Sequence, residues 1–179
     1  SMRIIAGLGN PGPEYRHHRH NAGFMILECF KDRHETRPGG KKWQAELFET
    51  DFRRLDGTRL QLILIQPQTF MNLSGKAIGP ALTYYRLPVS ELLVMHDEIE
   101  LPFGEVRRKS GGGHKGQNGL RSIIESCSAD FERLRFGVGR PAHGDVAGHV
   151  LSNFSSAEKE ALPALLDRSV ALVEEWLNQ

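Results

Sequence analysis

Residues 3–23 read Arg-Ile-Ile-Ala-Gly-Leu-Gly-Asn-Pro-Gly-Pro-Glu-Tyr-Arg-His-His-Arg-His-Asn-Ala-Gly. The apolar start predicts a short buried strand, and the glycines at 7, 9 and 12 then satisfy the G-x-G-x-x-G pattern of dinucleotide-binding loops. In such loops the pattern opens a helix whose N-terminus receives a pyrophosphate. Here Pro11 and Pro13 interrupt the backbone, and a cluster of histidine, arginine and asparagine follows. We therefore expect a loop that carries side-chain chemistry between a strand and a helix.

Strand-like and helix-like segments alternate along the rest of the chain. Apolar spacing predicts helices over 22–35, 73–85, 117–127 and from Ser155 onward, where Ser155-x-x-Glu158 forms a capping box. Strands are expected over 44–54 and 58–65, joined at Asp56-Gly57, and over 92–96, 104–109 and 131–139, whereas 37–42 indicates a break. The alternation predicts an α/β fold with three layers, in which a mixed, mostly parallel, twisted sheet is flanked by helices.

The composition indicates one globular domain over residues 1–179. Ser1 is interpreted as an added residue ahead of a native start at Met2. No apolar run reaches the ~20 residues of a membrane span, and no signal peptide is evident. Cys29 and Cys127 lie far apart without a C-x-x-C spacing, so we expect neither a disulfide framework nor a thiolate zinc site, and a cytoplasmic protein.

The charge of the chain is nearly balanced, but its distribution is uneven. A net charge of +1 argues against a general affinity for nucleic acid. Residues 107–121, however, contain three arginines and two lysines without one acidic residue. Such a segment indicates either a local surface for a polyanion or an ordinary solvated face.

Four loops rich in amide, histidine and aspartate side chains follow strand-like runs, at 10–21, 68–72, 96–98 and 114–119. Because ligands bind outside the carboxyl ends of strands in open α/β sheets, we expect these loops to converge on one cleft. His20 is the best candidate for a general base, with Asp97 as the acceptor that orients it. Asn10, Asn72 and Asn118 can hold a peptide or polarise a carbonyl group, although asparagine also caps turns.

Other chemistries have weaker support in the sequence. The serine-esterase pattern G-x-S-x-G is absent, and no recognised metal-ligand spacing such as H-E-x-x-H occurs among the histidines and acids. We expect no metal ion and no cofactor.

Six blocks resemble the bacterial-type peptidyl-tRNA hydrolases, in family order and over most of the chain. They are Gly-Leu-Gly-Asn-Pro-Gly at 7–12, Arg-His-Asn-Ala-Gly at 19–23, Thr-Phe-Met-Asn-Leu-Ser-Gly at 69–75, His-Asp-Glu at 96–98, Gly-Gly-Gly-His at 111–114 and Asn-Gly-Leu at 118–120. The resemblance implies hydrolysis of the ester that joins a peptide to tRNA in N-blocked peptidyl-tRNA released from ribosomes. It implies that His20 activates water, that Asp97 supports its charged form, and that Asn10 is catalytic and helps to reject unblocked aminoacyl-tRNA.

The resemblance also implies which residues bind the substrate. The residues expected to receive the peptide and the terminal adenosine are Tyr15, Phe70, Met71, Asn72 and Asn118. Lys109 and Arg135 match positions that clamp the tRNA 5′-phosphate. The partner is peptidyl-tRNA, and a monomer is expected, with no membrane and no obligate protein partner.

Two departures from the family pattern concern the tRNA contacts and one loop position. Gln117 stands where many members have a histidine, and the stretch Ala142–Asp145 is shortened. Because an amide neither donates nor takes up a proton near neutral pH, this position is not expected to be obligatory for proton transfer. Two alternatives remain open: a non-catalytic RNA-binding protein, suggested by the basic segment, and a nucleotide-cofactor enzyme, suggested by the glycine pattern alone.

Overall fold

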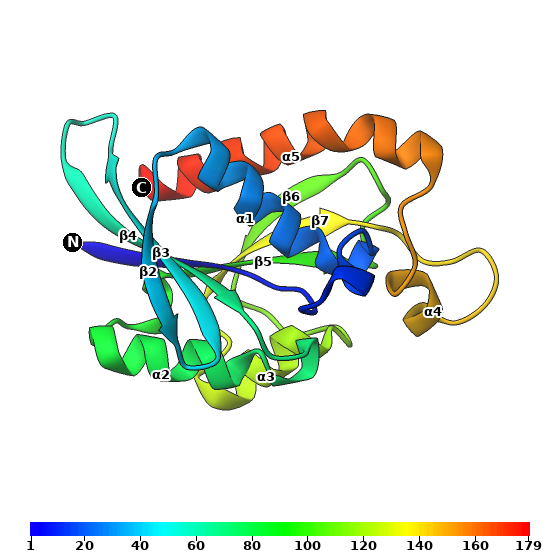
Figure 1. Cartoon of the computed structure of the whole chain (residues 1–179), viewed down its shortest axis with the longest axis horizontal. Coiled ribbons are helices and arrows are strands. Elements are labelled where there is room, and N and C mark those ends of the chain that lie inside the picture. The colour runs from blue at the N-terminus through cyan, green and yellow to red at the C-terminus, as the bar shows by residue number, and fades with distance from the viewer.

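The computed structural model describes all residues, 1–179. Seven strands form one sheet in the order β2-β3-β4-β1-β5-β7-β6 (Figure 1). Their bounds are β1 Met2–Gly7, β2 Arg37–Lys42, β3 Ala45–Arg53, β4 Arg59–Pro67, β5 Leu92–Glu98, β6 Val106–Ser110 and β7 Glu132–Gly137. The four central strands, β4, β1, β5 and β7, are parallel, whereas β2, β3 and β6 pair antiparallel at the two sides.

Helices cover both faces of this sheet. The α-helices are α1 Ala22–Arg33, α2 Gly75–Tyr85, α3 Asn118–Ser126, α4 Val146–Val150 and α5 Ser156–Leu177, and the 3-10 turns are η1 Pro13–Tyr15, η2 Arg19–Asn21, η3 Met71–Leu73 and η4 Val89–Glu91. Figure 1 shows α1 and α5 on one face and α2 and α3 on the other. The predicted three-layer α/β/α fold with a mixed sheet, parallel in its centre, is confirmed. No helix combines the length and the apolar composition that crossing a membrane requires.

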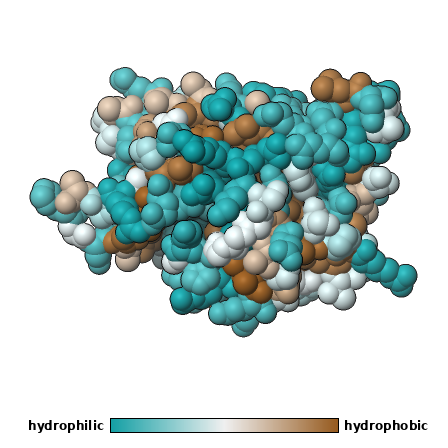
Figure 2. Space-filling view, turned by 180° about the vertical axis from the view of Figure 1, so that it is seen from behind, coloured by the Kyte–Doolittle hydropathy of each residue, from teal (hydrophilic) through white to brown (hydrophobic).

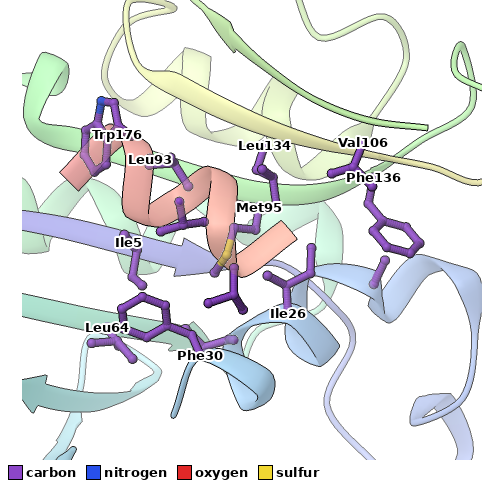
Figure 3. Packing of buried hydrophobic residues seen from close by; sticks show 14 of the residues in the cluster. Ile5, Ile26, Phe30, Leu64, Leu93, Met95, Val106, Leu134, Phe136 and Trp176 are labelled. Carbon is purple, nitrogen blue, oxygen red and sulfur yellow. The ribbon is translucent and has the colours of Figure 1, made fainter. Parts of the chain in front are cut away.

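Two apolar clusters fill the spaces between the sheet and the helices. In β1, Ile5 belongs to the cluster under α1 and α5, whereas Ile4 and Ala6 belong to the cluster over α2 and α3. Figure 3 shows the first cluster, in which Ile5 of β1 points toward Phe30 of α1 and Leu93 of β5 lies on the side of Trp176 of α5. Because successive side chains of a strand point to opposite faces, a strand buried on both sides must be apolar at nearly every position. The outer surface in Figure 2 is mostly hydrophilic, with separate hydrophobic patches.

The segment 37–42 corrects one sequence-based expectation. The preceding helix ends at Arg33, before this segment, and residues 37–42 form the edge strand β2, paired antiparallel with β3. An edge strand tolerates Pro38 because one side of its backbone needs no partner, and the register shifts between Pro38 and Gly40. The turn after it places Trp43 and Gln44 at φ 53° and 55°. These are positive angles that glycine or asparagine usually supplies, so the sequence carried no hairpin signal there.

The short helix α4 is the one α-helix that the sequence did not predict. Five residues are too few to establish a helical period, and its N-terminus is marked only by Asp145, whose side chain accepts a hydrogen bond from the backbone N–H of Gly148. In Figure 1 this helix lies beyond the sheet, on the side toward which β1 and β5 point. It thereby reaches the edge of the sheet where the strand-following loops gather.

Candidate active site

A cavity of about 500 Å³ lies at the carboxyl ends of the parallel strands. Of the ten residues expected to form the site, eight line this cavity: Asn10, Tyr15, His20, Phe70, Met71, Asn72, Asp97 and Asn118. Lys109 and Arg135 are not among the lining residues. The four loops singled out in the sequence therefore converge on one cavity, as the order of the parallel strands requires.

His20 and Asp97 form a hydrogen-bonded pair in the wall of this cavity. The His20 Nδ1 atom lies 2.8 Å from Asp97 Oδ2, and the side chain of Asp97 is only 2% exposed. Asp97 comes from β5, a central strand that is buried along its whole length. Because a carboxylate only accepts, Nδ1 carries the proton and Nε2 of the neutral ring keeps its lone pair for a substrate.

The environment of His20 shifts its protonation toward the charged form. Burial lowers the pKa of His20, but the attraction of the Asp97 carboxylate and the hydrogen bond to it raise the pKa by more, and the net result lies above the ordinary value. A raised pKa makes the neutral ring of His20 a stronger base. The pair can therefore take a proton from a bound water and stabilise the imidazolium that results.

Asn10 is fixed by its neighbours so that one group remains free. Its Oδ1 accepts a hydrogen bond from the backbone N–H of Met71 at 2.7 Å. Since that N–H can only donate, the orientation of the amide is determined, and Nδ2 is the group left for a ligand in the cavity.

Asn21 is a structural partner that the sequence reasoning did not assign. Its Oδ1 accepts from the backbone N–H of Asn10 at 2.9 Å, and its Nδ2 donates to the backbone C=O of Asn10 at 3.0 Å. Its burial and its double contact hold the Asn10 segment in place. The only signal in the sequence was its position beside His20, which does not distinguish a structural amide from a substrate-binding one.

Arg19 connects the histidine segment to a distant part of the chain. Its Nη1 donates to Ser152 Oγ at 2.7 Å and its Nη2 to Glu158 Oε1 at 2.8 Å, while its backbone N–H donates to the Ser152 carbonyl. The turn η2, which carries His20, is thus tied to the start of α5. This contact fixes the backbone beside the candidate base.

Gln117 lies on the other side of Asp97. Its Nε2 donates to Asp97 Oδ1 at 3.0 Å, and its Oε1 accepts from the backbone N–H of Leu120 at 2.8 Å, which caps the N-terminus of α3. Asn118 is the first residue of α3 and lines the cavity next to it.

Apolar side chains form the remaining walls. The rings of Tyr15 and Phe70 meet edge to face with centroids 6.0 Å apart, and Phe70 is 53% exposed, so a flat ligand can reach it. The helix α4 and the residue after it add apolar side chains that the sequence reasoning missed, namely Val146, Ala147, Val150 and Leu151. The cavity therefore combines an amide-lined, hydrogen-bonding region with hydrophobic walls.

Lys109 and Arg135 lie outside the cavity on neighbouring strands. In the antiparallel pair of β6 and β7, Lys109 is opposite Arg133 and Arg107 is opposite Arg135, so all four side chains share one face of the sheet. Lys109 is exposed, whereas Arg135 donates through Nε to Glu98 Oε1 at 2.9 Å. Glu98 lines the cavity, so this basic face begins directly behind the cavity wall.

The glycine pattern serves packing in this fold. A Cβ on Gly7 would lie 2.5 Å from the backbone oxygen of Gly23, and one on Gly9 would lie 2.7 Å from the ring of Phe24. Both positions allow the first loop to lie directly against α1, and Gly12 leads into a 3-10 turn with Pro13 at its start rather than into an α-helix. The nucleotide-cofactor alternative thereby loses the motif on which it depended. No group of three or more histidine, cysteine, aspartate or glutamate side chains is arranged to hold a metal ion.

The comparison with known families agrees with the resemblance noted in the sequence. The family model described as peptidyl-tRNA hydrolase matches residues 4–179. The chain belongs to the peptidyl-tRNA hydrolase family. Members of this family are enzymes, which favours catalysis over RNA binding alone.

Individual relatives extend over nearly the whole chain. A peptidyl-tRNA hydrolase of Geotalea daltonii is 48% identical over 175 residues, which cover 97% of this chain and 89% of that protein. One of Geobacter metallireducens is 48% identical over 179 residues, covering 99% of this chain and 90% of that protein. Among solved structures, the peptidyl-tRNA hydrolase of Acinetobacter baumannii superposes with a TM-score of 0.87 at 35% identity, covering 95% of this chain and 85% of that one.

Proposed function

We propose that this chain hydrolyses the ester bond between peptide and tRNA in N-blocked peptidyl-tRNA, with His20 as the general base. The observation that carries the proposal is the hydrogen-bonded pair of His20 and Asp97, which opens onto a cavity lined by three asparagines in a member of the peptidyl-tRNA hydrolase family. The enzyme would thereby recycle tRNA from peptides released prematurely by ribosomes. Residues 1–179 would act as one domain.

In the proposed reaction His20 Nε2 takes a proton from water while the water oxygen attacks the ester carbonyl. The tetrahedral intermediate then collapses, the bond to the terminal ribose oxygen breaks, and the imidazolium returns the proton to that oxygen. Asp97 stabilises the positive charge between these two steps. General-base assistance contributes about 10²–10⁴ to the rate, and a donor aimed at the developing oxyanion about 10²–10³.

The fixed amide of Asn10 supports selection of N-blocked substrates. Since Met71 occupies its oxygen, Asn10 offers only N–H donors to the cavity. A peptide carbonyl accepts such a donor, whereas the protonated amino group of an unblocked aminoacyl-tRNA offers donors only. We therefore propose that Asn10 favours peptidyl-tRNA over unblocked aminoacyl-tRNA.

The remaining site residues are assigned to the terminal adenosine, the peptide and the 5′-phosphate of the substrate. Tyr15 and Phe70 offer aromatic faces on which the terminal adenosine can stack, and Met71, Asn72 and Asn118 contact the peptide. Lys109 and Arg135 bind the 5′-phosphate next to the acceptor end. We further propose that the enzyme acts as a monomer in the cytoplasm.

The test is deacylation of an N-acetyl-aminoacyl-tRNA in the presence of EDTA. The parental chain is expected to release free tRNA, and His20→Ala to lose at least ~10²-fold in kcat. His143→Ala is the matched control, because His143 is exposed and does not line the cavity. An inactive parental chain, or full activity in His20→Ala, would contradict the proposal. Binding of tRNA without ester cleavage would instead support a non-catalytic RNA-binding protein.

A further inference from the structure

Gln117 joins the candidate catalytic pair to the first turn of α3. The side chain is half-buried, stands immediately before the helix, and contacts Asp97 at one end and the backbone of Leu120 at the other. Its Nε2 atom also lies 3.4 Å from Met71 Sδ. One amide therefore meets strand β5, turn η3 and helix α3.

The orientation of this amide follows from its partners. The backbone N–H of Leu120 can only donate, so it selects Oε1, and Nε2 must then face Asp97. Each oxygen of the Asp97 carboxylate consequently accepts from one N–H donor: Oδ1 from Gln117 and Oδ2 from His20. With both oxygens held, the carboxylate is not free to rotate away from the histidine.

The glycine-rich segment before α3 is held at its two ends. At one end the guanidinium of Arg133 donates to the carbonyls of Gly112 and Gly113. At the other end Gln117 contacts Asp97, while Lys115 and Gly116 between them are exposed and line the cavity. Without Gln117, no side chain would connect the start of α3 to the catalytic carboxylate.

We propose that Gln117 is a positioning residue, which holds the Asp97 carboxylate in the orientation that presents His20 as a base and keeps Asn118 aligned with that pair. The catalytic consequence rests on the proposed function. An amide does not titrate near neutral pH, so this contact persists where an imidazole would change its hydrogen-bonding pattern. The position thus supports the reaction without transferring a proton.

Two substitutions remove the donor and keep the helix cap. Gln117→Thr offers a hydroxyl that caps α3 but is too short to reach Asp97, and Gln117→Glu keeps the length and the acceptor but places a carboxylate against Asp97. We expect each to lower kcat by about 10- to 100-fold, as loss of a hydrogen bond to a charged group implies, with KM changed about twofold or less. Gln117→Thr should melt within about 3 °C of the parental chain, because the cap remains. Gln117→Glu should melt at a lower temperature, because the second carboxylate repels the buried Asp97.

The pH dependence of kcat separates the two variants. The charged groups that face His20 across the cavity are Asp97, Glu98 and Lys115, and α4 contributes only apolar side chains. In Gln117→Thr the carboxylate is held less firmly, so the acid limb of the profile should move to lower pH. In Gln117→Glu a second carboxylate favours the imidazolium, so the limb should move to higher pH.

Gln61 provides the matched control, because it is exposed on β4 at the end of the sheet away from the cavity. Gln61→Thr and Gln61→Glu should leave kcat, KM and the pH profile unchanged. Proton NMR of the His20 Nδ1–H signal supplies a readout that needs no substrate, and it should shift in both Gln117 variants and in neither control.

The proposal is overturned by a kcat within twofold of the parental value in either Gln117 variant, by a loss confined to KM, or by an unchanged His20 signal. Should the parental chain fail to cleave peptidyl-tRNA, the proposed function is wrong. The NMR comparison would still decide whether Gln117 positions the pair.

Discussion

Asn21 brackets the backbone of Asn10: it accepts from the N–H of Asn10 and donates to the C=O of Asn10, at 2.9 and 3.0 Å. Asn10 in turn accepts from the backbone of Met71, so two side chains without any charge connect the first loop, the turn η3 and the start of α1. The cavity-lining amide of Asn10 is thus positioned by a residue that is itself only 2% exposed.

Asn21→Ala is therefore expected to reduce both stability and activity. It leaves a buried backbone N–H and C=O without partners, at about 1–3 kcal/mol each, so thermal melting should fall by several degrees. Because the Asn10 segment is then released, kcat/KM for N-acetyl-aminoacyl-tRNA should fall by about tenfold or more. Asn153→Ala, at an exposed position, is the control. An unchanged melting temperature would show that Asn21 does not hold this loop.

Asp97→Asn should lower the pKa of His20. In the parental chain burial lowers that pKa and Asp97 raises it by more, so activity should fall as pH drops through a value above 6.5. Without the carboxylate only burial remains, and the acid limb should move below pH 6.5. The asparagine also offers one oxygen to two donors, His20 and Gln117, so kcat should fall at least ~100-fold. The measurement is kcat against pH, with the exposed Asp51→Asn as control; a limb that moves to higher pH would refute this account.

Asn10→Asp should weaken the preference for N-blocked substrates. The second carboxylate oxygen would face the cavity as an acceptor, so a free α-ammonium group gains a partner and a peptide carbonyl loses its donor. The measurement is kcat/KM for N-acetyl-aminoacyl-tRNA divided by kcat/KM for aminoacyl-tRNA. We expect this ratio to fall by about tenfold or more, since the unblocked substrate gains a hydrogen bond to a charged group and the blocked substrate loses one hydrogen bond. The two substrates serve as controls for each other. A ratio equal to the parental one would remove Asn10 from substrate selection.

Lys109→Ala should weaken tRNA binding without impairing the chemical step. KM should rise while kcat stays close to the parental value, and the slope of log kcat/KM against log salt should decrease by about one. Removal of the tRNA 5′-phosphate should raise the KM of the parental chain and leave the KM of Lys109→Ala largely unchanged. Lys41→Ala, on the far edge strand β2, is the control. If removal of the 5′-phosphate raised KM equally in the parental chain and in Lys109→Ala, Lys109 would not bind that phosphate.

The parts of the site that the sequence predicted are those attached to the regular sheet. β-strand patterning identifies both β1 and β5. Asp97 lies near the end of β5 and His20 lies in the loop segment after β1, and these strands are neighbours in the sheet, so the pairing follows from strand order. Asn21 and Gln117 could not be assigned because their partners are mainly backbone groups or caps, which depend on local geometry rather than residue type. The short helix α4 and the edge strand β2 were missed since neither has a hydrophobic period long enough to recognise.

The contacts of Arg19 with Ser152 and Glu158 join residues more than 130 positions apart in the chain. Closing a loop between segments so far apart in the sequence carries a high entropic cost, so we expect this latch to form late in folding. A partly folded chain therefore lacks the anchor of the turn that carries His20 until Ser152 and Glu158 pack against Arg19.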